Sequence, residues 1–494
     1  MNKILVSRPT HLYRWISLIF IAVAISLLMV SLVFYSRDRG NYPIGLSIGG
    51  VPVEGLNGAE ATQRLLQTFS TPVTATVQDS SFQIEPGLAG FTLNTEAMIA
   101  EADLRRTGTP FWRGFWNYLW NIKPEASDIP LVYTINKEHL SSYIKDEIKT
   151  RYDQPATPPI PIAGQSGYLE GQPGFVIMPD EAANTIEKAM ASSQERSVIL
   201  TLQKTSPGRP TLENLQIQIQ QLVDQTPFDG VVGVYMEDLT TRQYIHFGYD
   251  QNASISVNPD IAFTASSTIK IPILYSVVKH LGPSLDDGTK NLVMEMITKS
   301  ENPASDALMD AVGGPLVVSQ DMAELGLNNT FIAGYFYDGA PLLQNFSTDS
   351  NNRIDVNTNP DWYNQTTTSE MGQLLSDIYE CSQNGGGTFP AIAPDKFTQA
   401  SCTEMLGYLK QDRIGVLLEA GLPEGTQIAH KHGWISGPTG VIQNISDAGI
   451  IFSPGGDYIL VVYCYHPVQT VWEPVSGMIT KISQVVYNYF TLPQ

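Results

Sequence analysis

The chain has 494 residues, enough for two or three domains, and 43% of them are hydrophobic, which excludes global disorder. Its 29 Lys and Arg residues against 49 Asp and Glu residues give a formal net charge of -20. This balance argues against a nucleic-acid partner, because phosphate binding needs positive charge.

An apolar run without charged residues extends from Trp15 to Tyr35 and predicts a transmembrane helix over 15–35. It is long enough to cross a hydrocarbon core of ~30 Å. Basic residues before it favour a cytoplasmic segment over 1–14, with the rest of the chain outside the cytoplasm. A cleaved signal peptide is the alternative, with a small-residue site at 22–24, but the apolar run continues well beyond that site.

Beyond the anchor we expect a first domain over 41–205, a linker over 206–210 (Ser-Pro-Gly-Arg-Pro) and a second domain over 211–494. In the first domain, Ala59 to Phe69 predicts a short amphipathic helix. Alternating apolar residues from 73 to 84 predict a β-hairpin, and the Pro-rich stretch over 155–161 should be extended.

Three tryptophans, Trp112, Trp116 and Trp120, recur every four residues and would line one face of a helix. Three interpretations are open for this face. It is a core helix, a helix lying on the membrane surface, or an aromatic platform for glycan rings.

The run Tyr-Pro-Ile-Gly-Leu-Ser-Ile-Gly-Gly over 42–50, the helix after Gly58 and Gly-Gln-Pro-Gly-Phe over 171–175 resemble the VanW-associated domain of bacterial envelope proteins. That resemblance implies an α+β domain that binds peptidoglycan. It also implies localisation at a bacterial plasma membrane, as a single-pass protein with extracytoplasmic domains.

Cys381 and Cys402 flank a Gly-rich loop, while Cys464 lies in an apolar run that resembles a strand. The first two either pair as a disulfide in an oxidising compartment or remain buried thiols. The spacing of the three cysteines fits no zinc motif.

In the second domain, Thr211 to Asp224 predicts a helix and residues 230–247 predict a hairpin. Ser267 and Lys270 then form an S-x-x-K motif ahead of an apolar helix. Three residues apart on a helix, the hydroxyl and the amine share a face. The helix dipole supports a developing serine oxyanion, and burial would lower the lysine pKa so that the amine acts as a base.

Two further motifs follow in order. Ser300-Glu301-Asn302 stands 33 residues after Ser267, and Lys431-His432-Gly433-Trp434 lies near the C-terminus. The segments over 446–451 and 458–463 then predict the two strands of a hairpin, and residues 475–490 predict an amphipathic helix.

The order and spacing of these motifs resemble the class A β-lactamases and penicillin-binding serine hydrolases. The resemblance implies an α+β fold, with an antiparallel sheet covered by helices, behind a smaller α+β domain and one transmembrane helix. It also implies roles for eight residues. Ser267 is the acylated nucleophile, Lys270 its base, Ser300 the proton shuttle, Asn302 the ligand of the substrate amide, Lys431, His432 and Gly433 the binding strand, and Trp434 the second oxyanion donor beside Ser267.

Three residues or segments depart from the family pattern. Glu301 replaces an Asp, and His432 replaces a Thr or Ser and adds a possible charge below about pH 6.5. The E-x-x-L-N pattern of the omega loop, which supplies the deacylating base, is absent between Gly326 and Thr368. Asp338 is the nearest substitute, so we expect acylation to be better supported than turnover.

The expected function is therefore serine acyl transfer or hydrolysis on a β-lactam or a D-Ala-D-Ala-like stem peptide of peptidoglycan. No cofactor or metal is expected, and we expect structural roles for the scattered His139, His246, His280, His430 and His466. Two alternatives remain, a true β-lactamase with an unrecognised base and a non-catalytic scaffold that binds the cell wall. The oligomeric state is not predicted.

Overall fold

The computed structural model describes residues 10–251, 255–436 and 440–493, so residues 1–9 of the predicted cytoplasmic segment lie outside it. The chain divides into two compact units. The first contains residues up to Pro155 together with Pro173–Thr205, and the second contains Ala156–Gln172 and Ser206–Gln494. Residues 156–172, which the sequence analysis includes in the first domain, therefore pack with the second unit.

The first unit begins with the long apolar helix α1 (Thr10–Asp38). Residues 13–38 of this helix form a candidate membrane span with a mean hydropathy of 2.9, and no residue of the 18-residue stretch that defines the span is buried inside the protein. The other elements of the unit are short: β1 (Leu46–Ile48), β2 (Val51–Pro52), α2 (Gly58–Ser70), β3 (Val73–Val77), β4 (Ser80–Ile84), β5 (Thr92–Leu93), α3 (Thr95–Thr107), α4 (Phe111–Leu119), β6 (Ser127–Ile129), β7 (Tyr133–Thr134), α5 (Lys137–Tyr143), α6 (Thr150–Tyr152), β10 (Gly174–Ile177), α7 (Pro179–Met190), β11 (Ser197–Ile199) and β12 (Leu202–Thr205).

Two local predictions for this unit are confirmed. The strands β3 and β4 pair antiparallel as the expected hairpin, and β11 adds to β3 in parallel. Helix α2 buries Ala61, Leu65 and Phe69, which recur every four residues and so face one side of the helix. Asn57 caps that helix in a capping box with Glu60.

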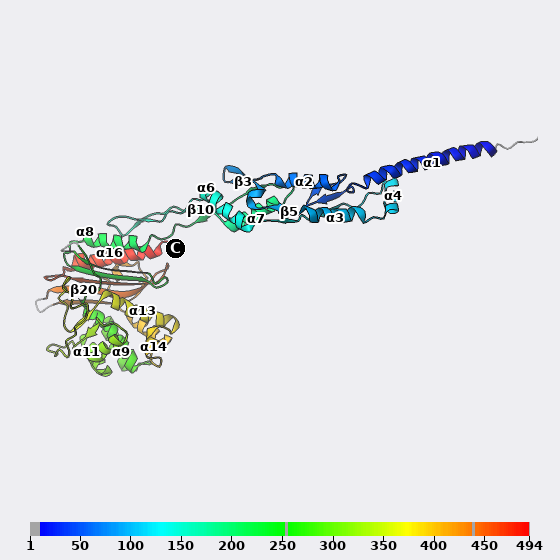
Figure 1. Ribbon diagram of the computed structural model, residues 1–494. Coiled ribbons are helices and arrows are strands. Elements are labelled where there is room, and N and C mark those ends of the chain that lie inside the picture. The colour runs from blue at the N-terminus through cyan, green and yellow to red at the C-terminus, as the bar shows by residue number, and fades with distance from the viewer. Residues whose placement is uncertain (1–9, 252–254, 437–439, 494) are drawn as a thin grey trace, which may run out of the picture. The chain divides into compact units, whose positions relative to one another are not determined.

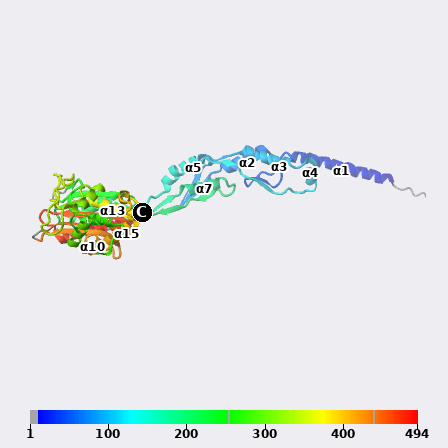
Figure 2. The ribbon, with the colours of Figure 1, turned by 90° about the horizontal axis from the view of Figure 1, so that it is seen from below.

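The core interpretation of the tryptophan face is wrong. Helix α4 lies beside the C-terminal end of α1 (Figure 1, Figure 2). Trp112, Trp116 and Trp120 are 70%, 59% and 64% exposed. The residues that pack inward are instead Phe111 and Phe115. Aromatic residues form two adjacent stripes on this helix. The stripe that packs against the rest of the protein is the one without tryptophan.

The second unit is built on an antiparallel sheet of six strands in the order β15-β14-β13-β21-β20-β19. The elements of this unit are β8 (Ile160–Pro161), β9 (Tyr168–Leu169), α8 (Leu212–Gln225), β13 (Val231–Asp238), β14 (Tyr244–Asp250), β15 (Ile255–Val257), β16 (Phe263–Thr264), α9 (Lys270–Leu281), α10 (Asp287–Thr298), α11 (Asn302–Val312), α12 (Pro315–Glu324), β17 (Phe331–Ile332), β18 (Asn364–Thr366), α13 (Thr368–Asn384), α14 (Thr388–Ile392), α15 (Gln399–Leu409), β19 (Gln427–Ser436), β20 (Ile442–Phe452), β21 (Tyr458–Tyr465) and α16 (Trp472–Thr491).

Helices cover both faces of this sheet. The terminal helices α8 and α16 pack together on one face, and α9, α11 and α13 lie on the other (Figure 1). Every residue of β21 is buried, because each face of that strand meets a layer of helices. The predicted antiparallel sheet covered by helices is confirmed, as are both of its predicted hairpins.

The cysteine alternatives are also decided. Cys381 on α13 and Cys402 on α15 form a disulfide, with their Cα atoms 5.7 Å apart. Cys464 is a buried free thiol on β21. The disulfide joins two helices of the layer that covers the sheet.

Candidate active site

Ser267 lies in a single 3-10 turn, Ser266–Ile269, between strand β16 and helix α9. Helix α9 is buried along most of its length, which fixes the turn at its N-terminus against the core. Ser266 adopts a left-handed conformation with φ of 53°, which costs a non-glycine residue about 1–3 kcal/mol. Ser267 itself is partly exposed, so its hydroxyl is accessible.

Lys270 is the hub of the site. It is fully buried, and its Nζ donates to Ser267 Oγ at 3.2 Å, Ser300 O at 2.6 Å, Ser300 Oγ at 3.0 Å and Asn302 Oδ1 at 3.1 Å. Burial, together with repulsion from Lys431, lowers the pKa of Lys270 to about 7. An amine with this pKa exchanges a proton readily near neutrality, as a general base must.

The connection between α10 and α11 supplies the second motif. Ser300 is left-handed with φ of 57°, and in this conformation both its carbonyl oxygen and its hydroxyl meet Lys270. Asn302 is the first residue of α11, and Pro303 follows it in the first turn of the helix. The structure therefore brings four of the predicted residues together, namely Ser267, Lys270, Ser300 and Asn302.

Strand β19 brings the third motif against the serine turn. A Cβ atom on Gly433 would lie 2.9 Å from the backbone nitrogen of Ser267, so the close approach of strand and turn requires glycine. Trp434, the next residue, is 37% exposed, and its indole stacks on His432 with ring centroids 4.9 Å apart. The predicted oxyanion pair, Ser267 and Trp434, is thus adjacent to the contact at Gly433.

A buried carboxylate that the sequence analysis missed binds this strand. Asp412, in the loop after α15, accepts a hydrogen bond from His432 Nδ1 at 2.8 Å and pairs with Lys431 Nζ at 3.4 Å. Burial opposes the charge of Asp412, but His432 and Lys431 outweigh it and lower the pKa of the carboxyl. No motif marks this residue in the sequence, since it follows a helix in an ordinary polar loop.

A second buried pair supports the same strand. His430 Nδ1 donates to Asp447 Oδ1 at 2.9 Å, and His430 Nε2 donates to the backbone carbonyl oxygen of Asp412 at 2.9 Å. Burial disfavours the imidazolium, yet Asp447 raises the pKa of His430 to about 9. His430 therefore links β19 to Asp447 on β20 and fixes the backbone at Asp412.

An aromatic ring from the connection between β17 and β18 lies near Lys270. Lys270 Nζ lies 5.4 Å from the ring centroid of Phe336. The backbone N–H of Phe336 donates to Asp306 Oδ1 at 2.8 Å, and burial raises the pKa of this acid. Asp306 lies one helical turn after Asn302, a spacing that the sequence analysis did not use.

Asp338, the predicted substitute for the missing acid, is exposed. Among residues 10–251, 255–436 and 440–493, no hydrogen bond or ion pair joins it to Ser267 or Lys270.

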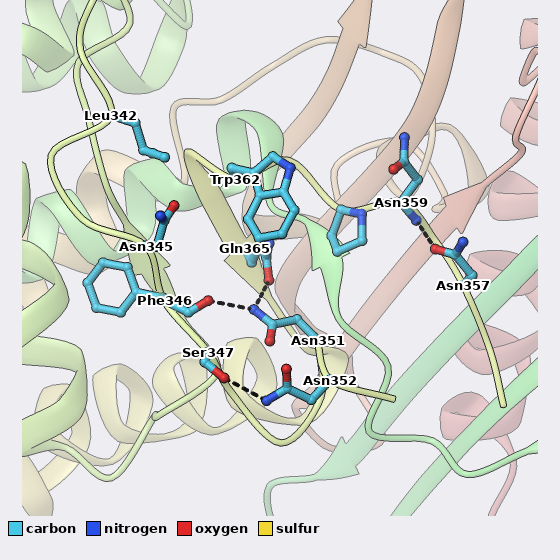
Figure 3. A pocket seen from close by; sticks show the side chains of 11 residues that line it. Leu342, Asn345, Phe346, Ser347, Asn351, Asn352, Asn357, Asn359, Trp362 and Gln365 are labelled. Atoms are coloured by element: carbon cyan, nitrogen blue, oxygen red, sulfur yellow. Dashed lines mark hydrogen bonds between the residues drawn. The ribbon is translucent and has the colours of Figure 1, made fainter. Parts of the chain in front are cut away.

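The rest of the connection between β17 and β18 lines an open pocket of about 650 Å³ (Figure 3). Five asparagines and the exposed Trp362 are among the residues that line it. Asn351 Nδ2 donates to Phe346 O at 3.1 Å and to Gln365 Oε1 at 3.0 Å, as Figure 3 shows. These amides hold the long insertion in a defined conformation.

Several solved structures are similar to part of this chain. PBP-A is 24% identical over 57% of this chain and 98% of its own, with a TM-score of 0.42. An ancestral class A β-lactamase is 20% identical over 55% and 98%, with a TM-score of 0.39. A β-lactamase from Chitinophaga pinensis DSM 2588 is 19% identical over 56% and 98%, with a TM-score of 0.41. No curated protein matches the chain.

The family comparison gives the matched residues. The model of the beta-lactamase enzyme family matches residues 214–285 and 280–490, more than half of the sequence. These residues include the serine turn, the Ser300 motif and the Lys431 strand, and the predicted β-lactamase and transpeptidase-like fold is confirmed. The chain therefore belongs to the beta-lactamase enzyme family.

Proposed function

We propose that this protein is a serine hydrolase that forms an acyl-enzyme through Ser267. The observation that carries the proposal is the position of Lys270 Nζ, within hydrogen-bond distance of Ser267 Oγ and Ser300 Oγ in a buried setting. Neutral Lys270 accepts the hydroxyl proton while Ser267 Oγ attacks the carbonyl carbon of the substrate. As the bond from the carbonyl carbon to the leaving nitrogen breaks, Ser300 gives its hydroxyl proton to that nitrogen and takes the proton held by Lys270 in its place, and the acyl group stays on Ser267.

The oxyanion of the tetrahedral intermediate is stabilised by the backbone N–H groups of Ser267 and Trp434. One such donor contributes ~3 kcal/mol to catalysis in comparable sites. The contact between Gly433 and Ser267 supports this assignment, because it sets the backbone of β19 against the serine turn.

The substrate we propose is a β-lactam or a D-Ala-D-Ala-like stem peptide of the cell wall. Such substrates carry a carboxylate, and Lys431 with His432 supplies the positive and hydrogen-bonding groups for it. Asp412 holds both side chains from behind. Asn302 is assigned to the substrate amide.

We propose that deacylation is slow. A hydrolysing enzyme needs a base near the acyl group to activate water, and the group beside Lys270 in the β17–β18 connection is the ring of Phe336. The exposure of Asp338 supports the same conclusion.

We further propose that α1 anchors the protein in a bacterial plasma membrane, with both units outside the cytoplasm. The disulfide between Cys381 and Cys402 supports an oxidising compartment. The first unit would bind peptidoglycan, in keeping with the VanW-associated domain that its sequence resembles. Tethering to membrane and wall raises the effective concentration of the active site at its substrate.

The test is intact mass of the full-length protein after exposure to benzylpenicillin, with Ser267→Ala as the matched control. We expect a persistent covalent adduct on the wild type and none on the variant. Rapid loss of penicillin without an adduct would favour a true β-lactamase with another base. Neither adduct nor loss of penicillin would favour a scaffold that binds the cell wall.

A further inference from the structure

Helix α4 carries two adjacent aromatic stripes with different surroundings. Phe111, Phe115 and Tyr118 meet the ring of Tyr35 on α1, with ring centroids 5.4, 5.5 and 5.5 Å away. The second stripe, formed by the three exposed tryptophans, has no such cover. We call this second stripe, Trp112, Trp116 and Trp120, the tryptophan face.

The contact with α1 is specific. Tyr35 Oη donates to the carbonyl oxygen of Phe111 at 3.3 Å, and Arg39 Nη2 donates to Thr109 O at 3.1 Å. The Arg39 guanidinium also lies 5.1 Å from the Phe111 ring centroid. A Cβ atom on Gly114 would lie only 2.1 Å from Tyr35 Oη. The close packing of Tyr35 on helix α4 therefore requires glycine at this position. Helix α4 is thereby held at the end of α1.

The position of Tyr35 sets the height of α4 above the membrane. From Trp15 to Tyr35 an α-helix rises by ~30 Å, which equals the thickness of a hydrocarbon core. Trp15 and Tyr35 therefore mark the two interfaces of the bilayer, where such aromatic residues are favoured. A helix packed on Tyr35 lies at the level of the headgroups.

The charge around the tryptophan face suits the same location. The segment over 104–123 contains Arg105, Arg106, Arg113 and Lys123 and no Asp or Glu, in a chain with a formal net charge of -20. Two of these cations pair with acids just before the segment, at Glu101 and Asp103. Arg113 and Lys123 are exposed and remain available to anionic lipid headgroups.

We propose that α4 is a second membrane contact, lying in the headgroup region of the outer leaflet with its tryptophan face toward the lipid. Tryptophan combined with basic residues is the composition of helices that lie in this interface. The proposal rests on the proposed anchoring by α1 and adds to it. A single spanning helix leaves the first unit free to tilt, whereas a second contact held through Tyr35 fixes its orientation to the bilayer.

The test is tryptophan fluorescence of the full-length chain in vesicles of phosphatidylcholine and phosphatidylglycerol, with acyl chains brominated near the headgroups or unbrominated. Trp15→Phe is the background, since Trp15 belongs to α1. Three of the six remaining tryptophans form the tryptophan face, so bromine should remove up to about half of the emission. The added triple change Trp112→Phe, Trp116→Phe, Trp120→Phe should abolish most of this quenching.

Trp362→Phe is the matched control, because Trp362 is 64% exposed, like Trp120, but belongs to the second unit. This change should leave the quenched intensity as it is. Anchoring is read separately, from flotation with the vesicles and from the additional quenching of Trp15 in the wild type. If the chain floats and Trp15 is quenched while the triple change has no effect, the inference about α4 is overturned and the anchor stands. If the chain does not float, the proposed anchoring itself has failed.

Discussion

Lys270 Nζ lies 3.2 Å from Ser267 Oγ, and the nearby charge of Lys431 is, after burial, the largest cause that lowers the pKa of Lys270. Lys431, which is itself paired with Asp412, therefore helps to lower the pKa of Lys270, the base in the proposed mechanism. The effect of the Lys431 charge on the pKa of Lys270 can be measured.

The first prediction concerns pH. Because only neutral Lys270 accepts a proton and its pKa is about 7, the acylation rate should rise between about pH 6 and pH 8. Lys431→Met removes a positive charge that disfavours protonation of Lys270, so the midpoint should move to higher pH. Lys431→Arg keeps the charge and should keep the midpoint. Stopped-flow acylation with a chromogenic cephalosporin measures all three profiles, and an unchanged midpoint in Lys431→Met would contradict the coupling.

The second prediction concerns the missed carboxylate. Asp412→Asn leaves the buried Lys431 ammonium without its ion-pair partner, and breaking a buried pair in this way costs about 3–5 kcal/mol. We expect a fall of this size in the free energy of unfolding, together with weaker acylation by substrates that carry a carboxylate. Asp338→Asn is the control at an exposed position and should change stability by less than about 0.5 kcal/mol. Denaturant unfolding gives both free energies. Equal stability of the two variants would contradict the inference that Asp412 stabilises the buried Lys431 ammonium.

The third prediction concerns turnover. Phe336→Glu introduces a carboxylate near Lys270, in the segment where the family pattern expects an acid. A positioned general base contributes about 10²–10⁴-fold to the rate in enzymes, so even an imperfect one should shorten the lifetime of the acyl-enzyme by about tenfold. Phe336→Gln introduces a side chain of the same shape as glutamate but without a base, and it should leave the lifetime of the acyl-enzyme unchanged. The decay of the penicillin adduct followed by mass spectrometry separates the two, and equal lifetimes would mean that another feature limits deacylation.

The fourth prediction concerns the disulfide. Cys381 and Cys402 are 21 residues apart, and closing a loop of this size stabilises a folded protein by about 3 kcal/mol in the chain-entropy account. The double variant Cys381→Ser, Cys402→Ser should lose about this much stability and still acylate, because neither cysteine is a member of the candidate site. Cys464→Ser is the control for loss of a thiol. If reducing agent destabilises the wild type no more than the double variant, the bond does not form in the isolated protein.

Local sequence predicted much of the candidate site. Ser267 and Lys270 meet because three residues of helical or 3-10 chain put their side chains on one face, and that geometry is independent of the rest of the fold. The long apolar helix α1 and the hairpin strands are likewise set by composition and periodicity over a few residues. Ser300, Asn302 and the Lys431 strand could be assigned because their order and spacing matched a known family.

Other parts of the site depended on contacts that no local pattern contains. Asp412 lies in a polar loop, and only packing of that loop behind β19 brings it to Lys431 and His432. Phe336 lies near Lys270 because its backbone is held by Asp306 on another element. A side chain in a loop acquires its role from the elements on which the loop packs.

Helix α4 shows the difference between what the local sequence predicts and what the tertiary structure decides. Periodicity placed Trp112, Trp116 and Trp120 on one face from the sequence alone, and that spacing is correct. Whether this face was buried could not be predicted, because the adjacent stripe is aromatic as well. The choice depends on Tyr35, 76 residues before Phe111, which packs on that adjacent stripe and leaves the tryptophans exposed. Helical geometry is set by neighbours along the chain, whereas burial is decided by residues that only the tertiary structure brings together.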